Sequence, residues 1–453
     1  MPALNIKRIG IIVICVIMSI FMCVIMLPLS MYAEAFEENA DEFLFNGNIY
    51  YQINEFNEIT ITRSRASVTE AVIPCEIDGM IVTEIKSSAF QGKTRLTKVV
   101  IPETVVSIGD YAFYQCTRLE DVCIPDSIEN IGWNIFKGTP WLQNQPEGCI
   151  IVGKGIIIGY NGESEHIVIP QGVTAIAGCS FENAKNLMSV DIPESVCDIG
   201  GLAFSGCSRL TECVIPEGVH TIGAYAFNWC KALQKVNIAD SVEKIGNHAF
   251  LGCSALISIK MPKNIDRIET ATFFGCTSLE KIVIPESVRD IGSQAFMECA
   301  SLNEITLSRN VESVGEWAFN GCCGLEKLTI YNGNCKIVDS EKTIEACTII
   351  CGFNRSSAQS YAQMYDRLFV PLVPLSGDMD QNGEIDISDA TYLLSLYANI
   401  CAGTITHISA FDMAAGDING NGDIDIGDAT IVLRIYAYQC AGLTEYDNIE
   451  FYE

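Results

Sequence analysis

The feature that most constrains this chain is a run of phenylalanines that recur every 23 residues. The run has one gap, after which it resumes with the same spacing. Its members are Phe90, Phe113, Phe136, Phe181, Phe204, Phe227, Phe250, Phe273, Phe296 and Phe319. A period between about 20 and 50 residues is typical of solenoids, in which each unit packs only on its neighbours. The spacing therefore predicts one elongated repeat domain.

Leucines and cysteines follow the phenylalanines with the same period. The leucines are Leu96, Leu119, Leu142, Leu187, Leu210, Leu233, Leu256, Leu279, Leu302 and Leu325. The cysteines are Cys116, Cys207, Cys230, Cys253, Cys276, Cys299 and Cys322. Because equivalent cysteines occupy the same place in successive repeats, we expect them to stack as small buried apolar side chains. Metal binding is disfavoured, since ligands have to converge and a ladder spreads them along an axis.

The repeat reads approximately Ile-Gly-x-x-Ala-Phe-x-x-Cys-x-x-Leu-x-x-Val-x-Ile-Pro. Val and Ile at alternate positions predict a short strand, which the following Pro ends. Equivalent strands one repeat apart would pair side by side in a parallel sheet. The Ala-Phe segment would form the other side of each coil, as a short helix or turn. The recurring glycine, for example Gly109 or Gly223, predicts a tight bend.

The flanking sequence predicts further segments. The boundaries are a signal peptide at 1–35, an N-terminal cap at 36–80, the solenoid at 81–331 with a hairpin insertion at about 145–170, a C-terminal cap at 332–373, a linker at 374–376 and a separate module at 377–453. Within the C-terminal cap, the spacing of Ala358, Tyr361, Ala362 and Tyr365 predicts a short helix with one apolar face.

The N-terminal residues indicate export. A basic start precedes an apolar run over residues 11–27, and residues 33–35 offer a small-x-small cleavage site. An uncleaved membrane anchor stays open as an alternative, because the run is about as long as a spanning helix requires. The net charge of −28 disfavours nucleic acids and anionic membrane surfaces as partners.

The repeat region, about 250 residues long, resembles the BspA-type leucine-rich repeat family of bacterial surface proteins. The resemblance implies a leucine-rich-repeat β-solenoid, with a parallel β-sheet, short helices or turns and about ten 23-residue repeats. It also implies a surface location and a hairpin inserted in one coil.

Two acidic segments beyond residue 376 match each other at a period of 39 residues. Oxygen-bearing side chains stand at loop positions 1, 3, 5, 9 and 12, with Gly at position 6 and a backbone carbonyl expected at position 7. That is the layout of an EF-hand-type calcium loop, in which hard oxygen ligands wrap one cation. The predicted calcium ligands are Asp378, Asp380, Asn382, Glu384, Asp386 and Asp389, and in the second copy Asp417, Asn419, Asn421, Asp423, Asp425 and Asp428.

Each loop runs into a predicted amphipathic helix. The apolar face is expected to carry Ala390, Leu393, Leu394 and Tyr397, and in the second copy Ala429, Val432, Leu433 and Tyr436. Cys401 and Cys440 are also 39 residues apart, and we expect them to be equivalent core residues.

This duplicated unit resembles a type I dockerin, a small all-α, EF-hand-like module. The resemblance implies two Ca²⁺ ions and calcium-dependent binding to a cohesin domain of a scaffoldin in a cellulosome-like complex for polysaccharide catabolism. It places the cohesin contacts at Ile387, Ser388, Thr391, Ser395, Ile426, Gly427, Thr430 and Arg434. Ile at loop position 10 departs from the Ser-Thr pair of the best-known dockerins, which leaves the cohesin class open.

No catalytic constellation is visible, because the four histidines are scattered and no nucleophile elbow, zinc motif or phosphate loop is present. The favoured hypothesis is a secreted, non-catalytic recognition or structural subunit whose solenoid binds a protein or glycan. A polysaccharide-active enzyme with an unrecognised site and a cell-surface adhesin are the alternatives. The strand positions expected to face a ligand are Lys98, Val100, Asp121, Asp191, Glu212, Lys235, Asn237, Lys260, Lys281, Val283, Glu304, Thr306, Lys327 and Thr329.

Overall fold

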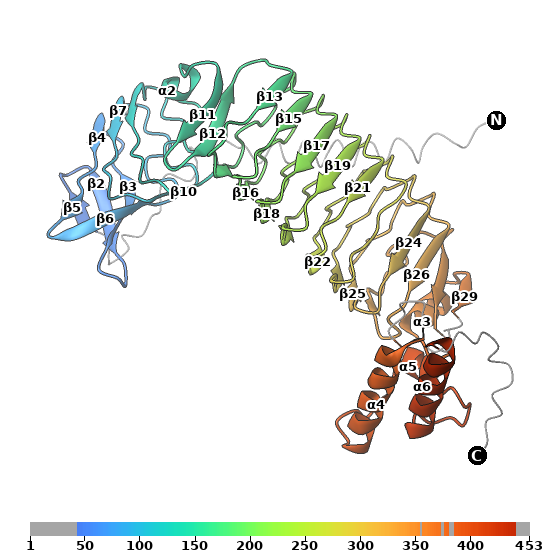
Figure 1. Ribbon diagram of the computed structural model, residues 1–453. Helices are drawn as coiled ribbons and strands as arrows, with labels where there is room; N and C mark the ends of the chain where they lie inside the picture. The colour runs from blue at the N-terminus through green and yellow to red at the C-terminus, as the bar shows by residue number, and fades with distance from the viewer. Residues whose placement is uncertain (1–42, 354–355, 373–375, 380–384, 441–453) are drawn as a thin grey trace, which may run out of the picture.

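The computed structural model describes residues 43–353, 356–372, 376–379 and 385–440. The predicted signal peptide lies outside these residues. Figure 1 shows an arc of stacked coils with a small group of helices at its C-terminal end. Within the described ranges, no helix is both long enough and apolar enough to span a membrane.

One side of the coils is a ladder of strands that end at the Ile of the Ile-Gly pair, which we call the Ile-Gly ladder. In Figure 1 it follows the inner side of the arc. Its strands form three sheets. The first has the order β1 (Phe43–Phe45), β2 (Ile49–Ile53), β3 (Ile59–Ser64), β6 (Met80–Ile85), β8 (Ser107–Ile108) and β10 (Asn130–Ile131), with β5 (Glu76–Ile77) beside β6; the second has the order β11 (Gly148–Val152), β12 (Ile156–Asn161), β14 (Ala175–Ile176), β16 (Asp198–Ile199), β18 (Thr221–Ile222) and β20 (Lys244–Ile245). The third has the order β22 (Arg267–Ile268), β23 (Asp290–Ile291), β25 (Ser313–Val314) and β27 (Lys336–Ile337).

The Val-x-Ile segments form a second ladder. Its strands are β4 (Glu70–Val72), β7 (Lys98–Val100) and β9 (Asp121–Cys123); β13 (His166–Val168) and β15 (Ser189–Asp191); β17 (Glu212–Ile215), β19 (Lys235–Ile238) and β21 (Ser258–Lys260); and β24 (Glu304–Leu307), β26 (Lys327–Ile330), β28 (Ile349–Gly352) and β29 (Phe369–Pro371). Neighbouring strands pair in parallel with a register of one repeat, for example Lys235 opposite Ser258. The Ala-Phe segments that join the two ladders are turns.

The described helices are few. They are α2 (Pro140–Gln143), α3 (Ser357–Met364), α4 (Ile387–Cys401), α5 (Ala410–Gly416) and α6 (Ile426–Cys440). The helix predicted near the end of the solenoid is present as α3, with Ser356 as its N-cap and Ala358, Tyr361 and Ala362 buried.

The stack has about 14 turns, more than the ten repeats that the phenylalanines indicate. The difference arises from coils that lack the phenylalanine. β3 pairs in parallel with β6 of the first phenylalanine coil, β12 and β13 belong to the inserted coil, and β27 and β28 extend the two ladders after the last phenylalanine. These coils keep the backbone pairing without the Phe, so the sequence pattern could not count them.

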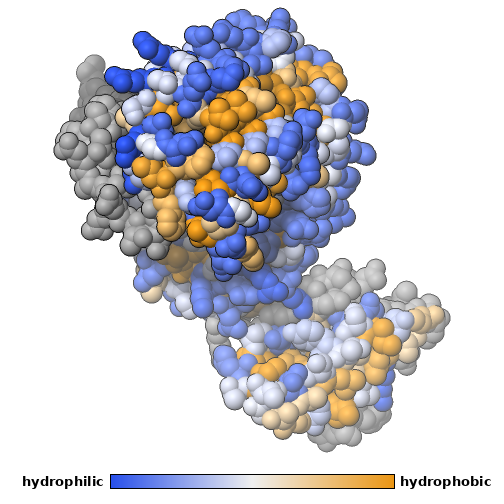
Figure 2. Space-filling model, turned by 90° about the vertical axis from the view of Figure 1, so that its left-hand side faces the viewer, coloured by the Kyte–Doolittle hydropathy of each residue, from blue (hydrophilic) through white to orange (hydrophobic). Residues whose placement is uncertain are grey.

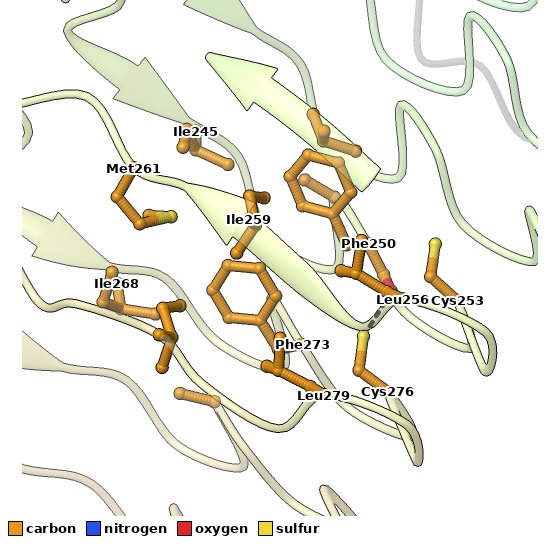
Figure 3. Close-up of a cluster of buried hydrophobic side chains, with 14 of the residues drawn as sticks. Ile245, Phe250, Cys253, Leu256, Ile259, Met261, Ile268, Phe273, Cys276 and Leu279 are labelled. Atoms are coloured by element: carbon orange, nitrogen blue, oxygen red, sulfur yellow. Dashed lines mark hydrogen bonds between the residues drawn. The ribbon is translucent and has the colours of Figure 1, made fainter. Parts of the chain in front are cut away.

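The phenylalanines form a continuous stack on either side of the insertion. Neighbouring rings lie 5.0–5.7 Å apart between centroids and are nearly parallel, as with Phe204 and Phe227 at 8°. Figure 3 shows two successive coils, in which Phe250 and Phe273 lie between the two ladders with Leu256 and Leu279 beside them. All ten rings are essentially inaccessible to solvent. The core of the solenoid is thus built by repeating one contact, the stacking of a phenylalanine ring on the equivalent ring of the next coil.

The cysteine ladder does more than fill space. All seven members are buried, and each thiol donates to the carbonyl oxygen of the phenylalanine 26 residues before it, as Cys230 does to Phe204 at 3.2 Å. Burial raises the pKa of Cys116 to about 11 and that of Cys207 to about 12, so the thiols keep the proton that they donate. The expectation of apolar stacking missed this hydrogen bond, which an alanine at the same position could not make.

The recurring glycine was interpreted wrongly. Gly109, Gly223 and their equivalents have no positive φ, so they do not serve a strained bend. A Cβ on Gly223 would lie 2.3 Å from the backbone nitrogen of Gly201 in the preceding coil. The glycine is needed because two backbones pass each other too closely for any side chain, which a single repeat cannot reveal.

The N-terminal end of the solenoid exposes apolar side chains. Figure 2 faces this end and shows hydrophobic residues gathered over it. They include Phe43, Phe56 and Ile81, with 48%, 73% and 51% of their surface exposed. The terminal strands therefore close the core without making this end polar.

The helical module packs on the opposite end of the solenoid. Phe353, near the last coil, is 2% exposed and belongs to the same apolar cluster as Leu393 of α4 and Val432 of α6. The Arg309 guanidinium lies 5.6 Å from the centre of the Tyr392 ring in α4 and donates to the carbonyl oxygen of Met379. The module and the solenoid thus share part of one core.

Candidate functional site

The two predicted calcium loops precede α4 and α6, and the same hydrogen bonds close both. Asp389 and Asp428, the last loop residues, are fully buried. Asp389 Oδ1 accepts from the Met379 N–H at 2.6 Å, and its Oδ2 accepts from the Asp386 N–H at 2.8 Å. Asp428 accepts the equivalent pair of bonds, both at 2.9 Å. In each copy, one buried carboxylate therefore ties the start of the loop to the start of the helix.

The second loop is described over its whole length. The Asn421 N–H donates to Asn419 Oδ1 and the Gly422 N–H to Asp417 Oδ2, both at 2.9 Å, while Asn421 Nδ2 donates to Asp425 Oδ2 at 3.2 Å. The remaining oxygen, Asp417 Oδ1, is buried without a hydrogen-bond partner. A buried carboxylate oxygen without a donor is costly. This atom fits a site that a cation completes.

The donors of the two loops are hard oxygens, which suit calcium better than a thiophilic metal. In the part of the chain that the structure describes, no group of three or more His, Cys, Asp or Glu side chains gathers as a metal site. The second loop offers the amide oxygens of Asn419 and Asn421 beside its carboxylates. The predicted ligands Asp380, Asn382 and Glu384 of the first loop lie outside the described residues.

The two loop-helix units face each other as a related pair, with α4 and α6 side by side (Figure 1). A hydrogen bond to the thiol four residues further on raises the pKa of Tyr397, and the Asp425 carboxylate adds to the rise. The pKa of Tyr436 is raised in the same way, with Asp386 as the added carboxylate. Each tyrosine therefore lies near the loop of the opposite unit, as antiparallel helices require.

The residues predicted to contact cohesin lie at equivalent places on the two units. Ile387 and Ile426 are 58% and 60% exposed. Ser388, Thr391, Ser395, Thr430 and Arg434 are exposed as well, and Gly427 is partly buried. Two further side chains, Leu394 and Leu433, are each 40% exposed. Each unit thus presents one isoleucine and one leucine to solvent beside polar side chains.

The two leucines correct the predicted apolar face. The sequence placed Leu394 and Leu433 in the core, whereas the buried side chains of α4 are Ala390, Leu393 and Leu396. Leu394 follows Leu393 by one residue, which rotates it by about 100° around the helix and away from α6. Sequence reasoning missed both leucines as surface candidates because they match the i+4 spacing of a core position.

Cys401 and Cys440 were expected in the core and are instead exposed. Each is the last residue of its helix, beyond the part that packs against the other unit. The two cysteines are nevertheless equivalent in the two units, because each forms a hydrogen bond with the tyrosine four residues before it.

The second candidate surface is the outward column of the Val-x-Ile ladder. Opposite charges face each other across several strand pairs, including Lys98 opposite Asp121, whose charged groups lie 2.7 Å apart, and Glu212 opposite Lys235. Such pairs stabilise a sheet and leave no patch of one sign. Val283 is 81% exposed in this column, but Thr329, predicted to face a ligand, is only 4% exposed. Thr329 lies on β26, near the end of the stack, opposite Cys351 of β28.

One place brings together a nucleophile, a base and an acid. His166 Nδ1 lies 2.7 Å from Ser189 Oγ, and His166 Nε2 lies 3.5 Å from Asp191 Oδ2. The three side chains stand on the paired strands β13 and β15 and are exposed to solvent, so no closed pocket holds a substrate beside them. The trio is best explained as a cross-strand polar contact, and it supplies no catalytic evidence.

The repeat matches a known family. The family described as "BspA type Leucine rich repeat region (6 copies)" matches residues 82–145, 160–280 and 220–350, which together make up more than half of the chain. No curated protein matches the sequence.

Several solved structures are similar over most of their length. A leucine-rich cell surface protein from Faecalibacterium prausnitzii A2-165 has 25% identity over 67% of this chain and 96% of its own, with a TM-score of 0.30. A leucine-rich repeat protein from Bacteroides ovatus ATCC 8483 has 23% identity over 73% and 99%, with a TM-score of 0.32. The pneumococcal vaccine antigen PcpA has 17% identity over 73% and 98%, with a TM-score of 0.35. These TM-scores are low, so the family match alone carries the classification.

Proposed function

The chain belongs to the BspA-type leucine-rich repeat family, and from that premise we propose that it is a secreted recognition subunit with two binding parts. The solenoid binds a protein or glycan, and the C-terminal module attaches the protein to a cohesin in a calcium-dependent way. Leucine-rich repeat proteins are generally non-enzymatic binding proteins, which agrees with the lack of a catalytic arrangement in the described residues.

The observation that carries the attachment role is the matched pair of loops. Asp389 and Asp428 make the same bonds in both copies, and Asp417 Oδ1 is left for a cation. In the second loop, Asp417, Asn419, Asn421 and Asp425 would hold Ca²⁺ through side-chain oxygens and Asp423 through its carbonyl. The first loop would use the corresponding residues from Asp378 to Asp389. The bound ion supplies a positive charge that neutralises the loop carboxylates and fixes the loop against its helix.

The cohesin surface is proposed at the two equivalent faces. Ile387 with Leu394, and Ile426 with Leu433, expose apolar area beside polar side chains, which is the composition of an interface centre with a polar rim. Because the units are related by approximate two-fold symmetry, either face can supply the same contacts. Ser388 against Gly427 and Ser395 against Arg434 are the differences that favour one orientation. Attachment through this module would place the protein on a cell surface or in an extracellular complex.

Titration calorimetry of the full-length protein against a panel of cohesins, with calcium and with a chelator, tests the module. Binding to at least one cohesin only in the presence of calcium is expected. Asp417→Asn should weaken calcium binding at least tenfold, whereas Asp423→Asn is the matched control, because position 7 uses its backbone oxygen. Binding that persists in the chelator, or no binding to any cohesin, contradicts the assignment.

The surface is tested with substitutions on both faces. Ile387→Asp or Ile426→Asp alone should reduce cohesin affinity less than the double variant, since one intact face remains. A loss in one single variant as large as that in the double variant would show that only one orientation is used, and no loss in the double variant would place the contact elsewhere. Thermal melting of each variant separates loss of contact from loss of fold.

A further inference from the structure

The Ile-Gly ladder has one opening that the hairpin insertion does not explain. β20 is the last strand of one sheet and β22 is the first strand of the next. In the neighbouring coils, Gly246 N–H donates to the Ile222 carbonyl at 2.8 Å and Gly292 N–H to the Ile268 carbonyl at 2.7 Å. Between them, the described bonds include none from Glu269 to Ile245.

One residue distinguishes this place from the other regular coils. Glu269 stands where seven other coils carry the glycine of the Ile-Gly pair. At those glycines a Cβ would come within 2.3–2.7 Å of the preceding backbone, as at Gly223 and Gly292. Lys86, Ala177 and Val338 also replace this glycine and keep the bond to the preceding coil at 2.8–3.0 Å, but each of them lies beside a coil without the phenylalanine. Glu269 lies between two coils that both carry the phenylalanine, where a Cβ disfavours the close approach of the backbones.

The opening is local. The rings of Phe250 and Phe273 are 5.7 Å apart, the widest spacing in the stack, and Figure 3 shows the two coils with Ile245 and Ile268 at their Ile-Gly edges. On the turn side the backbone bonds continue across the same coils, for example from Phe250 N–H to the Thr272 carbonyl at 3.0 Å. The coils therefore part along the inner side of the arc, while on the Val-x-Ile side the bridge from Ser258 to Lys281 still joins them.

The opening forms a polar cleft of about 390 Å³. Its lining residues are Glu243, Lys244, Ile245, Asp266, Arg267 and Glu269. The carbonyl of Ile245 and the N–H of Glu269, which pair with a neighbouring coil elsewhere in the ladder, face this cleft without that bond. The cleft thus offers donors and acceptors from the backbone together with side chains of both charges.

These features exclude most ligand classes. A divalent cation is disfavoured because no group of three acidic, His or Cys side chains gathers within the described ranges. An anion would meet three carboxylates, and Arg267 is already within 3.4 Å of Asp290 and 3.7 Å of Asp266. An inserted peptide strand needs coils about 9.6 Å apart, twice the strand spacing, and it is disfavoured because the turn side of the same two coils stays joined by backbone hydrogen bonds.

We propose that this cleft binds a neutral polyhydroxylated ligand, a sugar unit of a glycan. A hydroxyl group both donates and accepts, so it can satisfy the Glu269 N–H, the Ile245 carbonyl and the flanking carboxylates together. The volume suits one or two sugar rings. The inference rests on the proposed recognition role of the solenoid and assigns it a place, the inner side of the arc at Glu269.

Two variants isolate the cause of the opening. Glu269→Gly removes the Cβ, so the ladder closes, whereas Glu269→Ala keeps the Cβ and removes only the carboxylate. In hydrogen exchange on the full-length protein, the amides of residues 267–269 should exchange at least tenfold faster than those of residues 290–292 in the unchanged chain and in Glu269→Ala. In Glu269→Gly the difference should vanish. If the amides of residues 267–269 exchange as slowly as those of residues 290–292 in all three proteins, the ladder is not open at Glu269.

Ligand-observed saturation-transfer NMR on the same three proteins tests the ligand class. The probes are glucose, galactose, mannose, xylose, N-acetylglucosamine and cellobiose, with glucuronate as the anionic probe. At least one neutral sugar should bind the unchanged chain, with glucuronate weaker than glucose and at least tenfold loss in Glu269→Gly. Binding that survives Glu269→Gly overturns the cleft but leaves recognition by another surface of the solenoid intact. If no neutral sugar binds, the sugar inference fails, and a protein-partner screen then decides the recognition role separately.

Discussion

The solenoid and the C-terminal module are both built from repeats, but their copies meet in different ways. In the solenoid, successive copies are related by translation, so Phe227 packs on Phe204 and Phe250 at 5.2 and 5.4 Å. In the module, two copies face each other, so Tyr397 lies near the loop of the other copy. Translation lets any number of coils share one core, whereas a facing pair is complete after two units.

This difference decides what stabilises each region. The regular coils of the solenoid each add a phenylalanine to the core, and seven of these ten coils also add a thiol hydrogen bond. Among the residues that the structure describes, the core of the module comprises nine buried apolar residues, one of which, Phe353, comes from the end of the solenoid. Small cores usually need an additional stabiliser. The stability of the solenoid is therefore expected to be independent of ions, whereas the stability of the module is expected to depend on calcium and on its contact with the solenoid.

The largest effect is expected from a break in the middle of the ring stack. Phe227→Ala should lower the free energy of unfolding of the solenoid by about 3–5 kcal/mol, because it leaves a cavity between two rings. Urea unfolding followed by near-UV circular dichroism measures the loss. Phe56→Ala is the matched control, since Phe56 is 73% exposed. A loss no larger than that of the control would refute the stacked core.

A smaller loss is expected where two backbones approach each other. Gly223→Ala places a Cβ 2.3 Å from a backbone nitrogen, and overpacking of this kind typically costs about 1–3 kcal/mol. Gly159→Ala is the control, because its nearest contact would be an ordinary 3.4 Å. Thermal unfolding of both variants checks the difference. If Gly223→Ala is as stable as the control, the close-approach explanation of the glycine ladder is wrong.

Alkaline pH should weaken the solenoid through its buried thiols. The unfolded Cys116 thiol ionises near pH 9, whereas burial raises its folded pKa to about 11. Folding therefore loses stability as pH rises across this window, by about 1 kcal/mol for one such thiol at pH 10. Melting curves between pH 8 and 11 in a reducing buffer test this, and a flat profile for the solenoid would contradict it.

The smallest effect concerns one thiol hydrogen bond. Cys230→Ala removes the donor to the Phe204 carbonyl and should cost about 0.5–1.5 kcal/mol. Cys440→Ala, at an exposed site, should cost less than the error of measurement. Urea unfolding of both variants makes the comparison. Equal stability of the two variants would show that neither the hydrogen bond nor the packing of the Cys230 thiol stabilises the solenoid.

The sequence predicts the features that one repeat can show. The spacing of Phe204 and Phe227 determines the stack, and the alternation of Val and Ile determines the second ladder. Features that depend on contacts between coils were missed or misassigned, such as the bond from Cys230 to Phe204 and the close approach at Gly223. In the module, the loop pattern places the ligand residues, but which helix face is buried depends on how α4 meets α6. For that reason Leu394 was assigned to the wrong side.

The most direct test of the contrast is hydrogen exchange of the full-length protein with and without calcium, read by mass spectrometry. A chelator should lower the amide protection of residues 385–440 at least tenfold and should leave the amide protection of the coils around Phe227 unchanged. A hundredfold excess of calcium over its dissociation constant would stabilise the module by about 2.7 kcal/mol, which is enough to account for the expected tenfold change in amide protection. Unchanged protection in the module, or an equal loss in both regions, would contradict the account.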